Sequence, residues 1–152
     1  MANEVNRIQD QLQRSLVGNA WHGPAVLELL ADVNAIKAAA HPVPDAHSIW
    51  ELVMHIITWN RVGVARLQGG PGEPSDEENF PRVTDVTDAS WAKTLDDLKA
   101  SFRELDSAIA VVDEARLDQP IVEGKSSIYV TLHGVIQHGL YHAGQIAILK
   151  KM

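Results

Sequence analysis

The most constraining feature of this sequence is a regular series of apolar residues between Ser90 and Val112. Successive members are separated by alternating steps of four and three residues: Trp91, Leu95, Leu98, Phe102, Leu105, Ile109 and Val112. This spacing places their side chains in one stripe along an α-helix, and such a stripe has to be buried against other elements. The segment therefore predicts a long helix that packs in a bundle.

Two more long helices are predicted from the residues at their starts. Ser48-Ile49-Trp50-Glu51 has the form of a capping box, in which a serine and a glutamate three residues later satisfy backbone amides at a helix start. That helix should end near the Gly69-Gly70-Pro71 break. A C-terminal helix should begin between Ser127 and Thr131 and continue to the end of the sequence, because apolar residues recur along it.

The N-terminal third predicts shorter helices. One should run through Leu16 and be followed by an irregular link at residues 18–23. A further helix should open at Pro24, continue through Val33 and end in the segment 38–44. Convincing strand-like alternation is missing, apart from two short runs, Ile121-Val122 and Ile128-Tyr129-Val130. The expected fold class is all-α, in one domain that covers residues 1–152.

Composition narrows the range of functions. The chain has 152 residues, no cysteine and a formal net charge of −7. Without cysteine, thiol chemistry needs a thiol supplied from outside. The acidic balance argues against nucleic-acid binding, which needs a basic surface. We find neither a signal-like apolar run at the N-terminus nor an apolar stretch of bilayer length, so we expect a cytoplasmic protein with no membrane partner.

His138 and His142 indicate a metal site. They are four residues apart in the predicted C-terminal helix, so both imidazoles lie on one face, one turn apart. His55, in the predicted helix that begins near Ser48, is the best candidate for a third ligand. Three histidines with an open fourth position are typical of a reactive metal centre rather than a structural one. Gln145 lies on the same stripe as the pair, where its amide could orient a ligand or contact a substrate.

The same histidines have a simpler interpretation, in which they make ordinary hydrogen bonds between packed helices. Glu51, one turn before His55, could hold the other ring nitrogen of that histidine, although its sequence position favours a capping role. His22 falls in a link and could line a pocket, as could Trp59 and Tyr141. No nucleophile elbow, paired acid and base, or phosphate loop is recognisable in the sequence. The catalytic residues therefore stay unknown.

The longest predicted loop covers residues 69–89. It contains three prolines and the acidic run Asp76-Glu77-Glu78. A loop of this length in a compact domain is either mobile or functional, so we hold open that it covers the site.

Two segments resemble the DinB/YfiT-like superfamily of metal-binding four-helix-bundle proteins. They are His47-Ser48-Ile49-Trp50-Glu51-Leu52-Val53-Met54-His55-Ile56-Ile57-Thr58-Trp59 and Leu132-His133-Gly134-Val135-Ile136-Gln137-His138-Gly139-Leu140-Tyr141-His142-Ala143-Gly144-Gln145-Ile146. The early junction Ala20-Trp21-His22-Gly23-Pro24 agrees with them in order and separation. The resemblance covers essentially the whole chain. It implies an up-down-down-up bundle and one divalent metal ion, held by His55, His138 and His142.

The resemblance also implies a function. Characterised relatives are often thiol-dependent enzymes that use mycothiol, bacillithiol or glutathione in S-transfer or maleylpyruvate isomerisation. We therefore expect a metal-dependent S-transferase that activates an external low-molecular-weight thiol and acts on a small-molecule substrate, or a metal-dependent hydrolase. The alternative is a non-catalytic, damage-inducible stress-response protein that binds a metal ion or a small ligand. Zinc is the first candidate metal, while nickel, iron and copper also suit imidazole ligands. A homodimer is expected.

Overall fold

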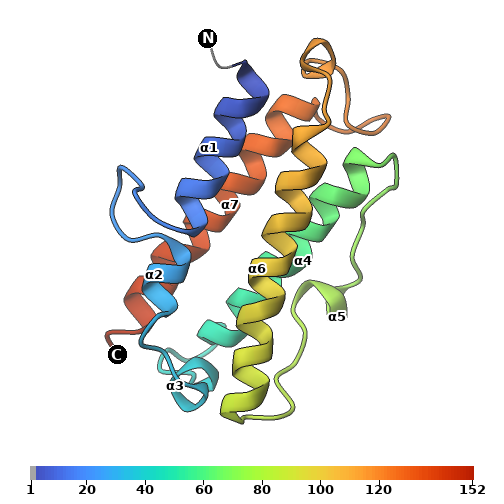
Figure 1. The fold of residues 1–152 in the computed structure, drawn as a ribbon. Helices are drawn as coiled ribbons and strands as arrows, with labels where there is room; N and C mark the ends of the chain where they lie inside the picture. Colours follow the sequence, from blue (N-terminus) through green and yellow to red (C-terminus); the bar gives the residue numbers. More distant parts are fainter. Residues whose placement is uncertain (1–2) are drawn as a thin grey trace.

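The computed structural model describes residues 3–152, and four long helices form its main body (Figure 1). These helices are α1 (Glu4–Leu16), α4 (Ile49–Leu67), α6 (Asp88–Ala110) and α7 (Ile128–Leu149). Four short helices lie in the connections: α2 (Val26–Leu30), α3 (Ala35–Ala39), α5 (Asp76–Asn79) and the 3₁₀ helix η1 (Glu114–Arg116). Within residues 3–152 there is no strand, only an isolated bridge between Pro120 and Ser127. The all-α prediction is confirmed.

The four long helices form a ring in which each packs against two neighbours, in the order α4, α6, α1 and α7. Figure 1 shows that α1 and α7 run in one direction, and that α4 and α6 run in the opposite direction. The topology is therefore up-down-down-up, as the resemblance implied. Consecutive parallel helices cannot be joined by a short turn, so the chain has to return along the bundle between α4 and α6. This requirement explains the long loop, which we call the crossover segment (residues 68–87).

The apolar stripe of α6 faces the centre of the bundle. Five of its predicted members are at most 7 % exposed: Trp91, Leu98, Phe102, Leu105 and Ile109. Burial of side chains of this size contributes about 1.5–3 kcal/mol each. Opposite this stripe, Gly63 of α4 lets the helices approach closely, because a Cβ atom there would lie 3.2 Å from Leu105 and 3.6 Å from Val135 of α7. The close packing of α4 against α7 sets the distance across which the histidines meet.

Both ends of α4 agree with the sequence prediction. At its start, Glu51 N–H donates to Ser48 Oγ at 3.2 Å, and Ser48 N–H donates to the Glu51 carboxylate at 2.8 Å. At its end, Gly69 adopts a positive φ of 86°. This conformation lets Gly70 N–H donate back to Ala65 O at 2.8 Å, which stops the helix at the predicted break.

The helix predicted from Pro24 through Val33 is wrong in its extent. The structure has two short helices there, α2 and α3, with a break between them. A continuous helix would pair Lys37 N–H with Val33 O. Instead, Lys37 N–H donates to Asn34 Oδ1 at 2.9 Å, and Trp91 Nε1 donates to Val33 O at 2.7 Å. The helix is interrupted because side chains satisfy both of these backbone groups.

No helix within residues 3–152 combines the length and the apolar character that crossing a bilayer requires.

Candidate metal centre

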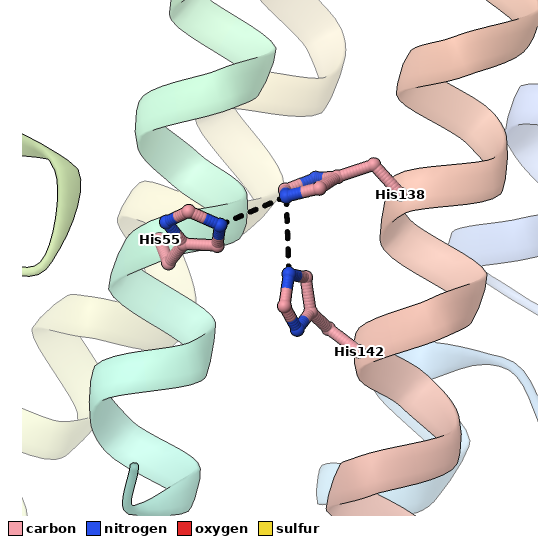
Figure 2. A group of neighbouring side chains, drawn as sticks. All are labelled: His55, His138 and His142. Atoms are coloured by element: carbon pink, nitrogen blue, oxygen red, sulfur yellow. Dashed lines mark hydrogen bonds between the residues drawn. The ribbon is translucent and has the colours of Figure 1, made fainter.

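Two helices bring the three predicted histidines together. His55 lies on α4, and His138 and His142 lie one turn apart on α7, whose start is fixed by Ser127 as N-cap. Figure 2 shows the three rings pointing toward one another across the space between these helices. The Nε2 atom of His138 lies 2.9 Å from His55 Nε2 and 3.0 Å from His142 Nε2. The three imidazoles therefore form one group that could hold a metal ion.

Hydrogen bonds on the far side of two rings fix which nitrogens are available. His55 Nδ1 lies 2.7 Å from Asn79 O, and His142 Nδ1 lies 2.6 Å from Gln145 Oε1. Both oxygens can only accept, so both Nδ1 atoms carry the hydrogen and each Nε2 atom presents a lone pair. His138 Nε2 can donate one hydrogen at most. One hydrogen cannot make good hydrogen bonds to both His55 Nε2 and His142 Nε2, so at least one of the two short contacts is not an ordinary hydrogen bond. If His138 carries its hydrogen on Nδ1, all three Nε2 lone pairs converge, and a cation between them would relieve their repulsion.

The geometry and the chemistry of this group both fit a divalent metal ion. Imidazole nitrogens bind zinc at about 2.0–2.1 Å, which places two ligands of a tetrahedral site about 3.3 Å apart. The two separations from His138 Nε2, 2.9 and 3.0 Å, are slightly shorter than this value, and the ligand atoms of all three histidines lie within 4.8 Å of one another. An adjustment of the ring positions would accommodate the ion. The donor set by itself also suits nickel, iron and copper.

Burial keeps the three imidazoles neutral. His55 and His142 are each only 6 % exposed. Desolvation, with smaller contributions from the neighbouring His142 and His55, lowers the pKa of His138 from 6.5 to about 3. Desolvation likewise lowers the pKa of His55 and the pKa of His142. Because the neutral imidazole is the form that binds metals, the site is ready to take up an ion near pH 7 without first losing protons.

The crossover segment packs directly on this group. The ring of Phe80 stacks on His55 with centroids 4.0 Å apart, and its other face stacks on His47 at 3.8 Å. Next to it, Asn79 accepts from His55 through its backbone oxygen and from Trp59 Nε1 through its side chain, the latter at 2.9 Å. The segment thus covers one side of His55 and fixes its orientation.

The sequence prediction missed the roles of Asn79 and Phe80. A usable signal was present: Ser75 and Glu78 have capping-box spacing, and the structure shows that they begin α5 in this way. Phe80 is also the only aromatic residue in the stretch 69–89. An isolated aromatic residue after a short helix in a polar loop suggests that the loop is anchored at that point.

A cavity of about 540 Å³ opens beside the histidines between α4 and α7. Tyr141, which is 68 % exposed, lies at its rim. The lining residues are His55, Trp59, Arg66, Ser126, Val130, Thr131, Gly134, Val135, His138, Tyr141 and His142. Such a cavity could admit a small molecule to the three imidazoles.

The remaining predicted site residues are found in different places. Trp59 and Tyr141 line the cavity, and Gln145 holds His142. Glu51 caps α4, and it does not hold His55, whose Nδ1 atom is bonded to the crossover segment. His22 is exposed in the link after α1 and is not among the residues that line the cavity.

Comparison with protein families gives one result. The family model described as the DinB superfamily matches residues 4–146, which is most of the chain. Searches of curated proteins and of solved structures found no significant match.

Proposed function

This chain belongs to the DinB superfamily, and we propose that it holds one divalent metal ion through His55, His138 and His142 and activates a low-molecular-weight thiol for S-transfer. The observation that carries the proposal is the convergence of three neutral imidazoles beside an open cavity. Three protein ligands leave a coordination position for an incoming molecule, which is the arrangement of catalytic rather than structural metal sites.

The chemistry of S-transfer sets what the site has to provide. A bound divalent ion lowers the pKa of a thiol or a water molecule that coordinates it. In the transfer itself, the thiolate sulfur attacks an electrophilic carbon, and a C–S bond forms. The bond from that carbon to its leaving group breaks, the leaving group departs with the electron pair, and the thiol proton passes to solvent. A hydrolytic variant would use water in place of the thiol.

The residues of the chain have separate tasks in this scheme. Asn79 and Gln145 hold the rings of His55 and His142 in the tautomer that presents Nε2. Phe80 covers His55 from the crossover side and limits access of water there. Trp59 and the apolar part of the cavity wall receive the body of a substrate.

A non-catalytic role in binding a metal ion or a small ligand is the second candidate. It is favoured by the composition of the cavity wall, because no aspartate or glutamate is found among its described residues. Apart from the proposed ligands, the wall therefore offers no ordinary general base. The two functions differ in a simple respect: only the transferase requires turnover of a thiol and an electrophile.

Metal content is the first test. Untagged protein should contain about one divalent ion per chain, and His55→Ala and His142→Ala should each lose it. His22→Ala is the matched control, because His22 is exposed and away from the group, and it should keep the ion. Folded wild-type protein that takes up neither zinc nor nickel would overturn the proposal.

Thiol chemistry is the second test. The metal-loaded protein should accelerate the reaction of bacillithiol, mycothiol or glutathione with an epoxide or a chloro-nitroarene, and the His55→Ala protein should not. Stoichiometric metal without turnover of any of these thiols would favour the non-catalytic role. We also propose that two copies associate, as the resemblance implies; a monomeric mass by light scattering would contradict this.

A further inference from the structure

The cavity beside the histidines has a second polar end. Arg66 lines it together with the three imidazoles, and apolar surface lies between them. We infer that the ligand of this cavity is an amphipathic carboxylate: its carboxylate is bound by Arg66, and an apolar segment connects it to the group that reaches the histidines. This inference deepens the proposed function, on which it rests, by naming the class of molecule that the site receives.

Helix geometry places Arg66 on the correct side of α4. Arg66 follows His55 by three turns, so both side chains leave the same face of the helix. The end of α4 that carries Arg66 lies beside the first residues of α7, at the same end of the bundle (Figure 1). The cavity therefore runs along the two helices, from the histidines toward Arg66.

The side chain of Arg66 is held in place before any ligand binds. Its Nε atom donates to Pro71 O at 3.3 Å, and its guanidinium carbon lies 5.7 Å from the ring centroid of Trp59. Gly72, at φ 49°, makes room for the aliphatic part, since a Cβ atom there would lie 2.9 Å from Arg66 Cγ. A guanidinium fixed in this way loses little conformational freedom on binding, and its planar fork matches a carboxylate.

The charges around Arg66 leave it able to bind an anion. Among the residues that the structure describes, Arg66 forms no ion pair. The neighbouring carboxylate, Glu73, is bonded to Lys125 at 2.6 Å. Lys125 and, to a smaller extent, Arg66 hold the pKa of Glu73 below its ordinary value. Near this end of the cavity, two cations, Arg66 and Lys125, therefore stand against one carboxylate, Glu73, although the chain as a whole has 20 acidic and 13 basic residues.

The wall between the two ends limits the length of a ligand that touches both. The Trp59 ring lies 5.8 Å from the His138 ring and 5.7 Å from the Arg66 guanidinium, so these distances bound their separation at about 12 Å. Val130 and Gly134 lie along this stretch, and Gly134 has no atom within 4 Å of where a Cβ would be. A ligand that touches both ends therefore spans at most about 12 Å, a length that a chain of several methylene groups can reach.

The test uses two thiols that differ only at one end, 6-mercaptohexanoate and 6-mercaptohexanol. Their affinities for zinc-loaded protein are measured by calorimetry in the wild type, in Arg66→Met and in Arg61→Met. Arg61 lies on the same helix but outside this cavity, where it pairs with Glu104 at 3.5 Å, so it is the matched control. The wild type and Arg61→Met should prefer the carboxylate. Arg66→Met should bind it roughly tenfold to hundredfold more weakly while leaving the affinity for the alcohol unchanged.

Several outcomes separate this inference from the proposed function. The carboxylate site would be overturned if the wild type bound the two thiols equally well, or if Arg66→Met lowered the affinities for both thiols by the same factor. Neither result would contradict the proposed metal centre. If the wild type takes up no zinc, the proposed function fails, and the same comparison is made with the metal-free protein. A preference for the carboxylate that depends on Arg66 would then still support the inference, and its absence would overturn it.

Discussion

Replacement of Gln145 by methionine should weaken metal binding without removing a ligand. The Gln145 carbonyl accepts from His142 Nδ1 at 2.6 Å, and His142 is 6 % exposed, so water cannot easily replace the lost acceptor. Leaving a buried donor unsatisfied costs about 1–3 kcal/mol. The unsupported imidazole can also rotate or adopt the other tautomer. Loss of such a supporting partner typically lowers metal affinity about 10- to 100-fold, or about 1.4–2.8 kcal/mol.

The affinity for zinc can be measured by competition with a chromophoric chelator, using untagged protein near pH 7. Methionine keeps the length and the helix propensity of glutamine, so α7 should stay folded, and a thermal melt of the metal-free proteins checks this. Gln137→Met is the matched control, because Gln137 is exposed on the same helix. A Gln145→Met protein that binds zinc as tightly as the Gln137→Met protein would refute the argument that Gln145 fixes the orientation of His142.

Two other perturbations test the electrostatics and the crossover segment. In the metal-free folded protein, His138 has a pKa of about 3, whereas in the unfolded chain its pKa is near 6.5. Between these two pH values the unfolded chain binds a proton that the folded chain does not. The free energy of unfolding should therefore fall as the pH drops from about 6.5 toward about 3. The free energy of unfolding can be measured with urea, in the presence of a chelator, between about pH 7 and pH 5. Its slope against pH should be smaller in His138→Asn than in the wild type, by up to about 1.4 kcal/mol per pH unit. Identical slopes in the two proteins would contradict the lowered pKa of His138. Phe80→Ala removes the ring stacks with His47 and His55, and it should lower the free energy of unfolding by about 1–3 kcal/mol. Hydrogen exchange should then rise in residues 68–87 more than in α6, whereas unchanged exchange would mean that Phe80 does not anchor the segment.

The sequence was most informative where local chemistry and periodicity agree. Ser48 and Glu51 satisfy each other at the start of α4, so the start of that helix depends on residues close together in the chain. The stripe of α6 is likewise a local pattern, because any helix with that spacing must bury one face. The approach of His138 and His142 follows from helix geometry alone. His55 was the best candidate for the third ligand from its place in another predicted helix, and the family resemblance implied the same three residues.

Contacts between distant segments were not predictable in the same way. The break between α2 and α3 depends on Trp91, which lies 58 positions away from its acceptor, Val33. The support of His55 by Asn79 and the place of Arg66 in the cavity wall depend on the path that the crossover segment takes. Neither residue type is unusual in a loop or at a helix end. Their roles became visible only once the helices were placed relative to one another.

The distance along the chain between His55 and His138 has a consequence for biosynthesis. The two imidazoles meet at 2.9 Å although 83 positions separate them, and His138 belongs to the last helix in the sequence. A nascent chain that has released α4 and α6 from the ribosome, but not α7, has only one of the three imidazoles. The three-histidine site therefore cannot form, and cannot capture an ion, until translation has supplied α7 and that helix has docked.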